Sequence, residues 1–350
     1  MPGYVERALQ RFSHPDPTRP QDSPHAHVRP QFGAKIQLTE EPDTSEPLSK
    51  EQTKRAQEVC GTLLYYARAV DGTMLKALGS IAAQQAKATT NTMKAVTQLL
   101  NYAATHPNAV VRYTASDMVL HIDSDASYLS EPKARSCIAG YHHLSFHPKQ
   151  PLDENAPEPT FNGAIHIVCS ILRTVVSSAA EAELAALFYN CKEACAIRTT
   201  LEELGHKQPA TPVRTDNTTA SGIANDTVKQ KRSKAIDMRY YWVRDRTKQG
   251  QFQIYWQKGK LNRADYFTKH HPPSHHRNVR TAYVYEPNND TNYFDLLHEQ
   301  EKNETQKQVT WAPGTKPAAT EPPRNLRSSL EHREGVLKSS PGSHESVNPA

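Results

Sequence analysis

The sequence predicts an α/β protein whose main domain is a mixed β-sheet flanked by helices. Apolar runs with a period of two residues occur three times between positions 118 and 172, which is typical of half-buried strands. Residues 179 to about 204 then carry apolar side chains at helical spacing, and two more strand-like runs follow. Consecutive strands form an antiparallel meander, whereas strands separated by helices join a sheet through crossovers. A sheet of mixed direction is therefore expected.

The five expected strands are short and end at polar residues. They cover residues 118–125, 136–145, 163–172, 212–215 and 252–256. The first three are expected to form the meander, and the last two are expected to lie beside the first strand. The last strand is followed by another expected helix, which opens at Asp265.

A helical region is predicted before the sheet. Apolar side chains recur at helical spacing, as in Leu63, Leu64, Ala67 and Val70. The expected helices cover residues 50–70, 73–85 and 89–105. Together they define a helical region at 50–107, which follows a proline-rich segment at 1–49.

Composition places the folded part in the middle of the chain. Only 37% of the 350 residues are hydrophobic, so part of the chain is expected to lack a packed core. Eight of the 25 prolines lie within residues 1–50 and seven lie after residue 285. We therefore expect the main domain at 110–272 and a disordered tail at 286–350, where large apolar residues are few.

Four acidic residues stand at the ends of expected elements. Asp125 ends the first strand, Glu183 lies near the start of the long helix, Asp216 ends the fourth strand, and Asp265 opens the late helix. Carboxylates that converge repel one another unless a hard cation neutralises them, and Mg²⁺ prefers such oxygen ligands. Two Mg²⁺ ions about 3.5–4 Å apart, with Mn²⁺ able to substitute, would activate a water and stabilise the leaving oxygen of a phosphodiester. The pattern predicts a metal-dependent nuclease.

Two of these positions have a competing acid. Asp123 lies two residues before Asp125 on the same strand, so both side chains face the same way. Glu181 similarly competes with Glu183, although an acid in the first turn is also favoured by the helix dipole alone. The residues themselves leave both alternatives open.

A basic stretch gives a second indication of function. Residues 229–248 contain eight Lys or Arg residues against two acids, with Tyr240, Tyr241 and Trp242 among them. Such cations contact nucleic-acid phosphates, although the same pattern suits a solvated helix with its aromatic residues toward the core. The candidate nucleic-acid-binding residues are Asn217, Lys231, Arg232, Lys234 and Arg239.

Five motifs in this order resemble the ribonuclease H domain of copia-type retrotransposon polyproteins. They are SDASY at 124–128, SSAAEAEL at 177–184, TDN at 215–217, KRSKAIDMRY at 231–240 and ADYFTK at 264–269, and they cover roughly residues 110–270. The resemblance implies a ribonuclease H-like fold and catalytic, metal-binding roles for the four acids, with Asp125 and Glu183 preferred. It also implies a thumb-like or connecting role for residues 50–107.

The resemblance implies that the chain cleaves the RNA strand of RNA–DNA hybrids and works with the polymerase portion of a longer polyprotein. No Tyr-x-Asp-Asp palm motif is present, so polymerase activity is not expected from this chain. A catalytically inert nucleic-acid-binding remnant is the alternative. An integrase or transposase is a third possibility, but those enzymes place the Glu on a late helix. Many ribonucleases H carry a His before the last Asp, where this chain has Gln257, Lys258 and Gly259.

The remaining observations concern the cellular setting. No apolar run is long enough to cross a membrane, so no membrane partner is expected. The five cysteines are odd in number and scattered, which favours reduced thiols and an intracellular protein. A cytoplasmic particle and the nucleus are not distinguished.

Overall fold

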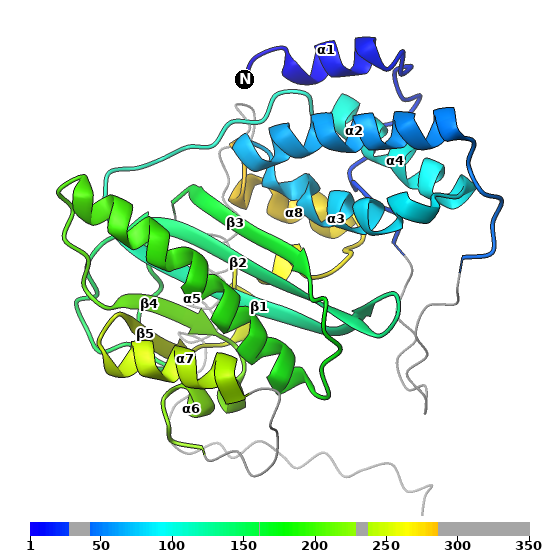
Figure 1. The fold of residues 1–350 in the computed structure, drawn as a ribbon. Helices are drawn as coiled ribbons and strands as arrows, with labels where there is room; N and C mark the ends of the chain where they lie inside the picture. Colours follow the sequence, from blue (N-terminus) through cyan, green and yellow to red (C-terminus); the bar gives the residue numbers. More distant parts are fainter. Residues whose placement is uncertain (28–42, 161, 229–236, 286–350) are drawn as a thin grey trace, which may run out of the picture. The chain divides into compact units, whose positions relative to one another are not determined.

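The computed structural model describes residues 1–27, 43–160, 162–228 and 237–285. A five-stranded sheet with the strand order β3-β2-β1-β4-β5 forms its centre (Figure 1). The three strands β1, β2 and β3 run antiparallel, while β4 is parallel to β1 and β5 is parallel to β4. This arrangement confirms the predicted mixed α/β sheet. The strands are β1 (Val119–Glu131), β2 (Arg135–Ser145), β3 (Ala164–Ile171), β4 (Thr211–Thr215) and β5 (Phe252–Trp256).

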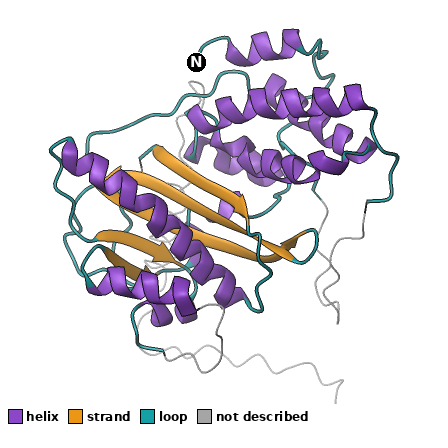
Figure 2. Ribbon diagram, viewed as in Figure 1, coloured by secondary structure: helices purple, strands orange, loops and turns teal. Residues whose placement is uncertain are grey.

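One face of the sheet is covered by helices that follow β3 in the chain. The long helix α5 (Ala179–Glu203) lies across β1 and β2, and α7 (Asp237–Lys248) lies beside it (Figure 2). The short helix α6 (Thr218–Ala224) begins directly after β4. Apolar side chains of these helices and strands form a common core cluster, which includes Leu187, Val213 and Val243. The expected crossover helices are therefore present.

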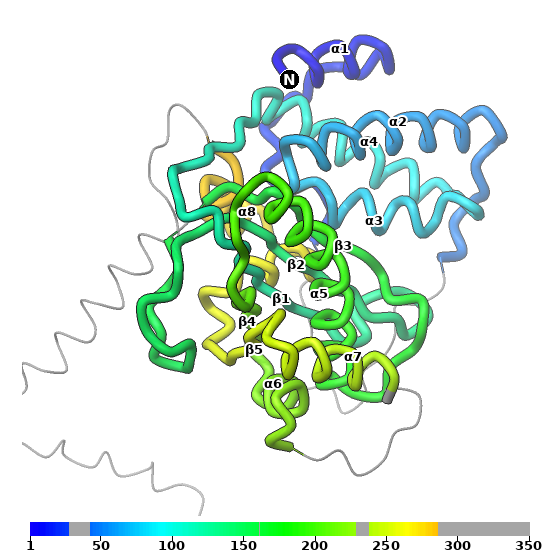
Figure 3. Tube along the Cα trace, turned by 60° about the vertical axis from the view of Figure 1, so that its left-hand side comes forward, coloured from blue at the N-terminus to red at the C-terminus, as the bar shows by residue number. Residues whose placement is uncertain are grey.

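Three helices form the region before the sheet, close to their predicted limits. They are α2 (Lys50–Ala69), α3 (Leu75–Gln84) and α4 (Thr90–Thr105), which Figure 3 shows from a second side. The side chains of Ser49 and Thr89 cap α2 and α4 through capping boxes, which explains why these helices start where they do. The first turn expected at residue 73 is a separate 3₁₀ turn at Gly72–Met74.

A further helix, α1 (Tyr4–Arg11), lies within the proline-rich segment 1–49 and was not predicted from the sequence. Its buried residues Val5 and Ala8 belong to the core of the helical region. The structure therefore adds one packed helix to the sequence-based account.

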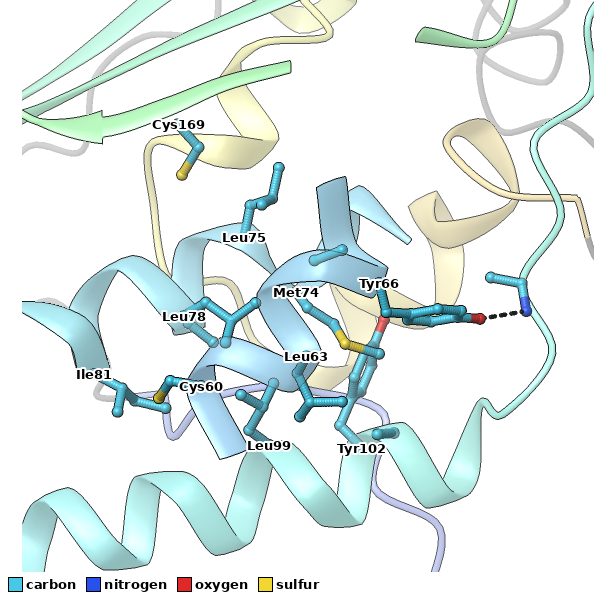
Figure 4. Packing of buried hydrophobic residues seen from close by; sticks show 14 of the residues in the cluster. Cys60, Leu63, Tyr66, Met74, Leu75, Leu78, Ile81, Leu99, Tyr102 and Cys169 are labelled. Atoms are coloured by element: carbon cyan, nitrogen blue, oxygen red, sulfur yellow. Dashed lines mark hydrogen bonds between the residues drawn. The ribbon is translucent and has the colours of Figure 1, made fainter. Parts of the chain in front are cut away.

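The helical region and the second face of the sheet share one hydrophobic core. Leu63, Leu78 and Leu99 of the helices belong to the same cluster as Cys169 of β3 (Figure 4). The cluster also includes Phe267, which follows β5 in the chain and is fully buried. The core is thus continuous across the boundary expected between residues 107 and 110.

Residues after position 272 complete this core. Helix α8 (Pro273–Val279) and the following turn contribute Val279 and Ala282 to the cluster. Arg280 forms a buried ion pair with Asp71, with 2.9 Å between Nη2 and Oδ2. The expected tail at 286–350 lies outside the described residues. None of the helices that the structure describes combines the length and apolar character of a membrane span.

Candidate active site

Three of the four predicted acids meet at one edge of the sheet. Asp125 lies on β1, Glu183 on α5 and Asp216 directly after β4. One carboxylate oxygen of each lies within 4.8 Å of the others. Asp125 and Glu183 are buried, whereas Asp216 is partly exposed. The cluster therefore has a buried floor and one side that solvent can reach.

The pairing of the strands explains this convergence. Strand β4 is parallel to β1, and its Arg214 lies opposite Asp123. Asp125 follows Asp123 by two residues, and Asp216 follows Arg214 by two residues, just after the end of β4. The two acids therefore lie side by side. Glu183 reaches them from the first turns of α5, where its Oε1 accepts a hydrogen bond of 3.1 Å from the backbone N–H of Ala126.

Asp265 lies next to the three acids but outside their close group. It opens a 3₁₀ turn, Asp265–Phe267, rather than the longer helix that the sequence indicated. Its carboxylate is paired with the ammonium of Lys269. Burial, followed by the negative charge of Asp265, nevertheless raises the pKa of both Asp125 and Asp216.

Burial and mutual repulsion disfavour the ionised form of these acids. Burial, followed by the charge of Asp265, raises the pKa of Asp125 to about 7. Burial, followed by the charge of Asp125, raises the pKa of Glu183 well above its ordinary value. The buried Oε2 of Glu183 also has no hydrogen-bond partner within the described part of the chain. Hard oxygen donors with unsatisfied negative charge fit a divalent cation.

The structure separates Asp125 from its competitor Asp123. The carboxylate of Asp123 accepts bonds from Arg214 at 3.0 Å (Nε) and 2.7 Å (Nη2), and it also pairs with Arg263 at 3.3 Å. Burial opposes ionisation of Asp123, yet these two guanidinium groups hold its pKa well below the ordinary value. Both carboxylate oxygens of Asp123 are therefore bonded to arginine side chains, and Asp125 is the acid of this strand that joins the cluster.

Arg214 connects several parts of the site through the same network. Its guanidinium is fully buried and also bonds Glu158 at 2.5 Å and the carbonyl of Leu261 at 2.7 Å. These bonds join β1 and β4 to the segment that leads to Asp265. A buried charge network of this kind fixes the relative positions of the chain segments that carry the acids.

Glu181 has a structural role at the start of α5. Its Oε2 accepts hydrogen bonds of 2.6 Å from both the backbone N–H and the hydroxyl of Ser177. Its own N–H donates to the Ser178 hydroxyl at 3.2 Å. Glu181 therefore belongs to the helix cap, while Glu183, half a turn further, faces the acids.

The candidate nucleic-acid-binding residues are distributed differently. Asn217 caps α6, with its Oδ1 accepting from the N–H of Ala220 at 2.9 Å. The guanidinium of Arg239 lies over the rings of Phe188 and Tyr189, 5.9 and 5.6 Å from their centroids. Tyr241 is 57% exposed rather than turned toward the core. Lys231, Arg232 and Lys234 lie outside the described residues.

Two further contacts at the site were not identified from the sequence. The hydroxyl of Thr268 donates to Oδ2 of Asp125 at 2.6 Å. Gly259 lies against Asp216, and a Cβ at this position would come within 2.4 Å of its Oδ2. A glycine directly after a strand was a usable signal for the second contact, whereas nothing local to Thr268 indicated the first.

The chain is similar in sequence to a retrotransposon polyprotein. No family model matches this chain. It is 24% identical, over 268 residues, to the retrovirus-related Pol polyprotein from transposon TNT 1-94 of Nicotiana tabacum. The chain resembles a copia-type Pol polyprotein. The match covers 76% of the chain but spans only 18% of the length of that polyprotein.

Solved structures with a similar arrangement include ribonuclease H domains. The N-terminal RNase H domain of a Mycobacterium tuberculosis protein matches 43% of this chain and 91% of its own, with 12% identity and a TM-score of 0.29. LC11-RNase H1 in complex with RNA/DNA hybrid gives the same values. Prototype foamy virus protease-reverse transcriptase matches 43% of this chain and 19% of its own, with 17% identity and a TM-score of 0.25.

Proposed function

We propose that this chain is a metal-dependent endonuclease that cleaves the RNA strand of RNA–DNA hybrids. The observation that carries the proposal is the cluster of Asp125, Glu183 and Asp216, whose oxygens lie within 4.8 Å of one another at the edge of a mixed sheet. The similarity to a retrotransposon Pol polyprotein supports a nucleic-acid substrate. The polymerase portion of such a polyprotein is the partner that we propose.

The metal-binding residues would be Asp125, Glu183 and Asp216, with Asp265 beside them. The raised pKa values of Asp125, Glu183 and Asp216 and the unpartnered oxygen of Glu183 fit Mg²⁺ as the resident ion, and Mn²⁺ offers the same oxygen chemistry. When bound, two such ions activate the attacking water and stabilise the leaving 3′ oxygen of the phosphodiester.

The chain itself orients these ligands. Thr268 holds one oxygen of Asp125, and the N–H of Ala126 holds one oxygen of Glu183, so each acid keeps its second oxygen for the ion. Lys269 neutralises Asp265 at the rim of the cluster. Acids fixed in this way need little reorganisation when the substrate arrives. A covalent protein nucleophile is not required.

Recognition of the hybrid is proposed to depend on shape and sugar. A protein distinguishes an A-like duplex mainly by its minor groove, its 2′-hydroxyls and its backbone, rather than by base sequence. Sequence preference should therefore be low. We further propose that residues 50–107 act as a thumb-like or connecting region and that 110–272 form the ribonuclease H-like domain.

Cleavage of labelled duplexes by the purified chain tests this function. We expect Mg²⁺-dependent cleavage confined to the RNA strand of a hybrid, with RNA duplex and DNA duplex of the same sequence left intact. Chelation of the metal should abolish the activity. Binding of the hybrid without any metal-dependent cleavage would instead indicate an inert nucleic-acid-binding remnant, and equal cleavage of all three duplexes would exclude ribonuclease H specificity.

A further inference from the structure

A cavity lies beside the acids, between the helical region and the tip of the β1–β2 hairpin. Its volume is about 500 Å³. Helix α3 and the residues after it form one wall, the hairpin forms the other, and residues 268–270 form the end nearest the acids. Lys76 of α3 and Glu131 of β1 form a buried ion pair across it, so the two walls are directly connected.

The lining of this cavity is strongly basic. Two acids, Asp43 and Glu131, line it together with five cations, so its formal charge is +3 (five minus two). The five cations are Lys76, Lys87, Lys133, Arg135 and Lys269. A concave surface with this excess of positive charge attracts polyanions.

Within the described residues, two of the five cations are paired with acids and three are not. Lys76 is paired with Glu131, and Lys269 is paired with Asp265. The side chains of Lys87, Lys133 and Arg135 make no hydrogen bond or ion pair within the parts of the chain that the structure describes. Lys87 and Lys133 are exposed and Arg135 is half-buried, so all three are available to a ligand.

The hairpin that carries two of these cations has a strained backbone. Leu129, Lys133 and Ala134 adopt positive φ angles of 54°, 63° and 54°, a region that residues other than glycine rarely occupy. The pairing of β1 with β2 is also irregular between Ser127 and Glu131.

The cavity borders the acid cluster through two shared residues. Thr268 and Lys269 line its inner end. The same two residues contact the cluster, since Thr268 bonds Asp125 and Lys269 pairs with Asp265. A polyanion seated among Lys87, Lys133 and Arg135 would therefore lie next to residues that contact the acids.

We propose that this cavity binds consecutive phosphates of a nucleic-acid strand and so positions the duplex for cleavage. The choice of ligand rests on the proposed function, because the acids act on a phosphodiester only if a strand reaches them. Lys87, Lys133 and Arg135 would each contact a phosphate. The helical region thereby supplies part of the substrate-binding surface.

The test is equilibrium binding of a labelled RNA–DNA hybrid to the full chain in chelator, where cleavage cannot interfere. We compare the wild type with the triple variant Lys87→Gln, Lys133→Gln, Arg135→Gln over a series of salt concentrations. The slope of log affinity against log salt should become shallower by roughly 2–3, since each lost phosphate contact removes about 0.9. Affinity at low salt should fall at least tenfold.

A matched control removes the same charge elsewhere. Lys54, Lys149 and Lys207 are exposed and lie outside this cavity, so the variant with all three changed to Gln has the same net charge. We expect its salt slope to stay within 1 of the wild-type slope. Equal effects of the two triple variants, or an unchanged slope in the cavity variant, would overturn the proposal.

This experiment distinguishes failure of the proposed phosphate site from failure of the proposed cleavage activity. If the cavity variant loses salt dependence while the wild type never cleaves the hybrid, the phosphate site stands and the proposed activity fails. If the wild type cleaves and the cavity variant binds with an unchanged slope, the activity stands and the site fails. Thermal melting of both triple variants, expected within a few degrees of the wild type, shows that their folds are intact.

Discussion

At the scale of single residues, Asp125 is subject to opposing effects. The hydroxyl of Thr268 stabilises its ionised form, while burial and the charge of Asp265 destabilise it. Its pKa in the folded protein is about 7, compared with an ordinary value of 3.8. Because the pKa of Asp125 is higher in the folded than in the unfolded protein, protonation of this acid favours the folded state. That contribution is complete below about pH 4 and is lost as the pH rises through about 7. Bound cation would offset that loss.

Replacing Asp125 by Asn should therefore stabilise the metal-free protein at high pH. We expect Asp125→Asn to raise the unfolding free energy by about 1–3 kcal/mol at pH 8 and by less than 1 at pH 5, since the repelling charge is gone. Thermal melting in chelator measures this, with Asp16→Asn as control because Asp16 is exposed and distant from the cluster. Parallel pH curves for Asp125→Asn and the wild type would contradict the assignment.

The sequence identifies the candidate acids but does not distinguish metal-binding acids from neighbouring acids on the same element. Asp125 and Asp216 were identifiable because each follows an apolar strand. Asp123 and Asp125 could not be separated, since both face the same side and only tertiary partners distinguish them. Those partners, Arg214 and Arg263, lie 91 and 140 residues away in the chain. No local pattern reports such contacts.

At the scale of elements, the turn after β5 shapes the site. Gly259 opens the 3₁₀ turn Gly259–Leu261 and packs directly against Asp216. The indole N–H of Trp256, at the end of β5, donates to the backbone carbonyl of Asp216 at 2.9 Å. Two contacts from one strand end therefore fix the position of an acid that follows another strand.

Gly259→Ala should impair the site without unfolding the protein. The new Cβ would displace the carboxylate of Asp216, because its Oδ2 lies only 2.4 Å from that position. We expect hybrid cleavage to fall at least tenfold, which corresponds to about 1.4 kcal/mol of lost transition-state stabilisation. Gly61→Ala is the matched control, since a Cβ on this residue of α2 meets no atom within 4 Å. Unchanged cleavage by Gly259→Ala would show that this contact does not matter.

The elements themselves were largely predictable. Apolar spacing located α2, α4 and α5 within one or two residues of their observed ends, and β5 was predicted at its observed limits. Strand β1 extends to Glu131 instead of ending at Asp125, because it continues into the irregular hairpin with β2. The helix expected at Asp265 is a single 3₁₀ turn, followed by α8 only at Pro273.

At the scale of the whole molecule, the shared core makes the helical region and the sheet interdependent. Tyr141 of β2 and Phe267 stack with 6.4 Å between ring centroids, inside the cluster that also contains Leu63 of α2. The sequence indicated the two regions separately, because each has its own periodicity. That they share one core depends on contacts between residues more than 100 positions apart, which periodicity does not report.

Phe267→Ala should consequently destabilise both regions to the same extent. Removal of a buried phenylalanine costs about 3–5 kcal/mol. In urea, far-UV circular dichroism reports mainly the helices, and the fluorescence of Trp242 and Trp256, measured in a Trp311→Phe background, reports the sheet domain. We expect both transitions to coincide and to shift together, while Tyr65→Ala, at an exposed position of α2, shifts neither by more than about 1 kcal/mol. Two separated transitions would show independent domains.

The most direct measurement compares two glutamates on one helix. Glu183 belongs to the acid cluster, whereas Glu181 caps α5 two residues earlier. We measure the rate of hybrid cleavage with Mg²⁺ for Glu183→Gln and Glu181→Gln. We predict that Glu183→Gln lowers the cleavage rate at least 100-fold, which corresponds to about 2.7 kcal/mol of activation free energy. We predict that Glu181→Gln lowers the rate less than threefold. Similar rates for the two variants would contradict the assignment of the acid cluster as the catalytic centre.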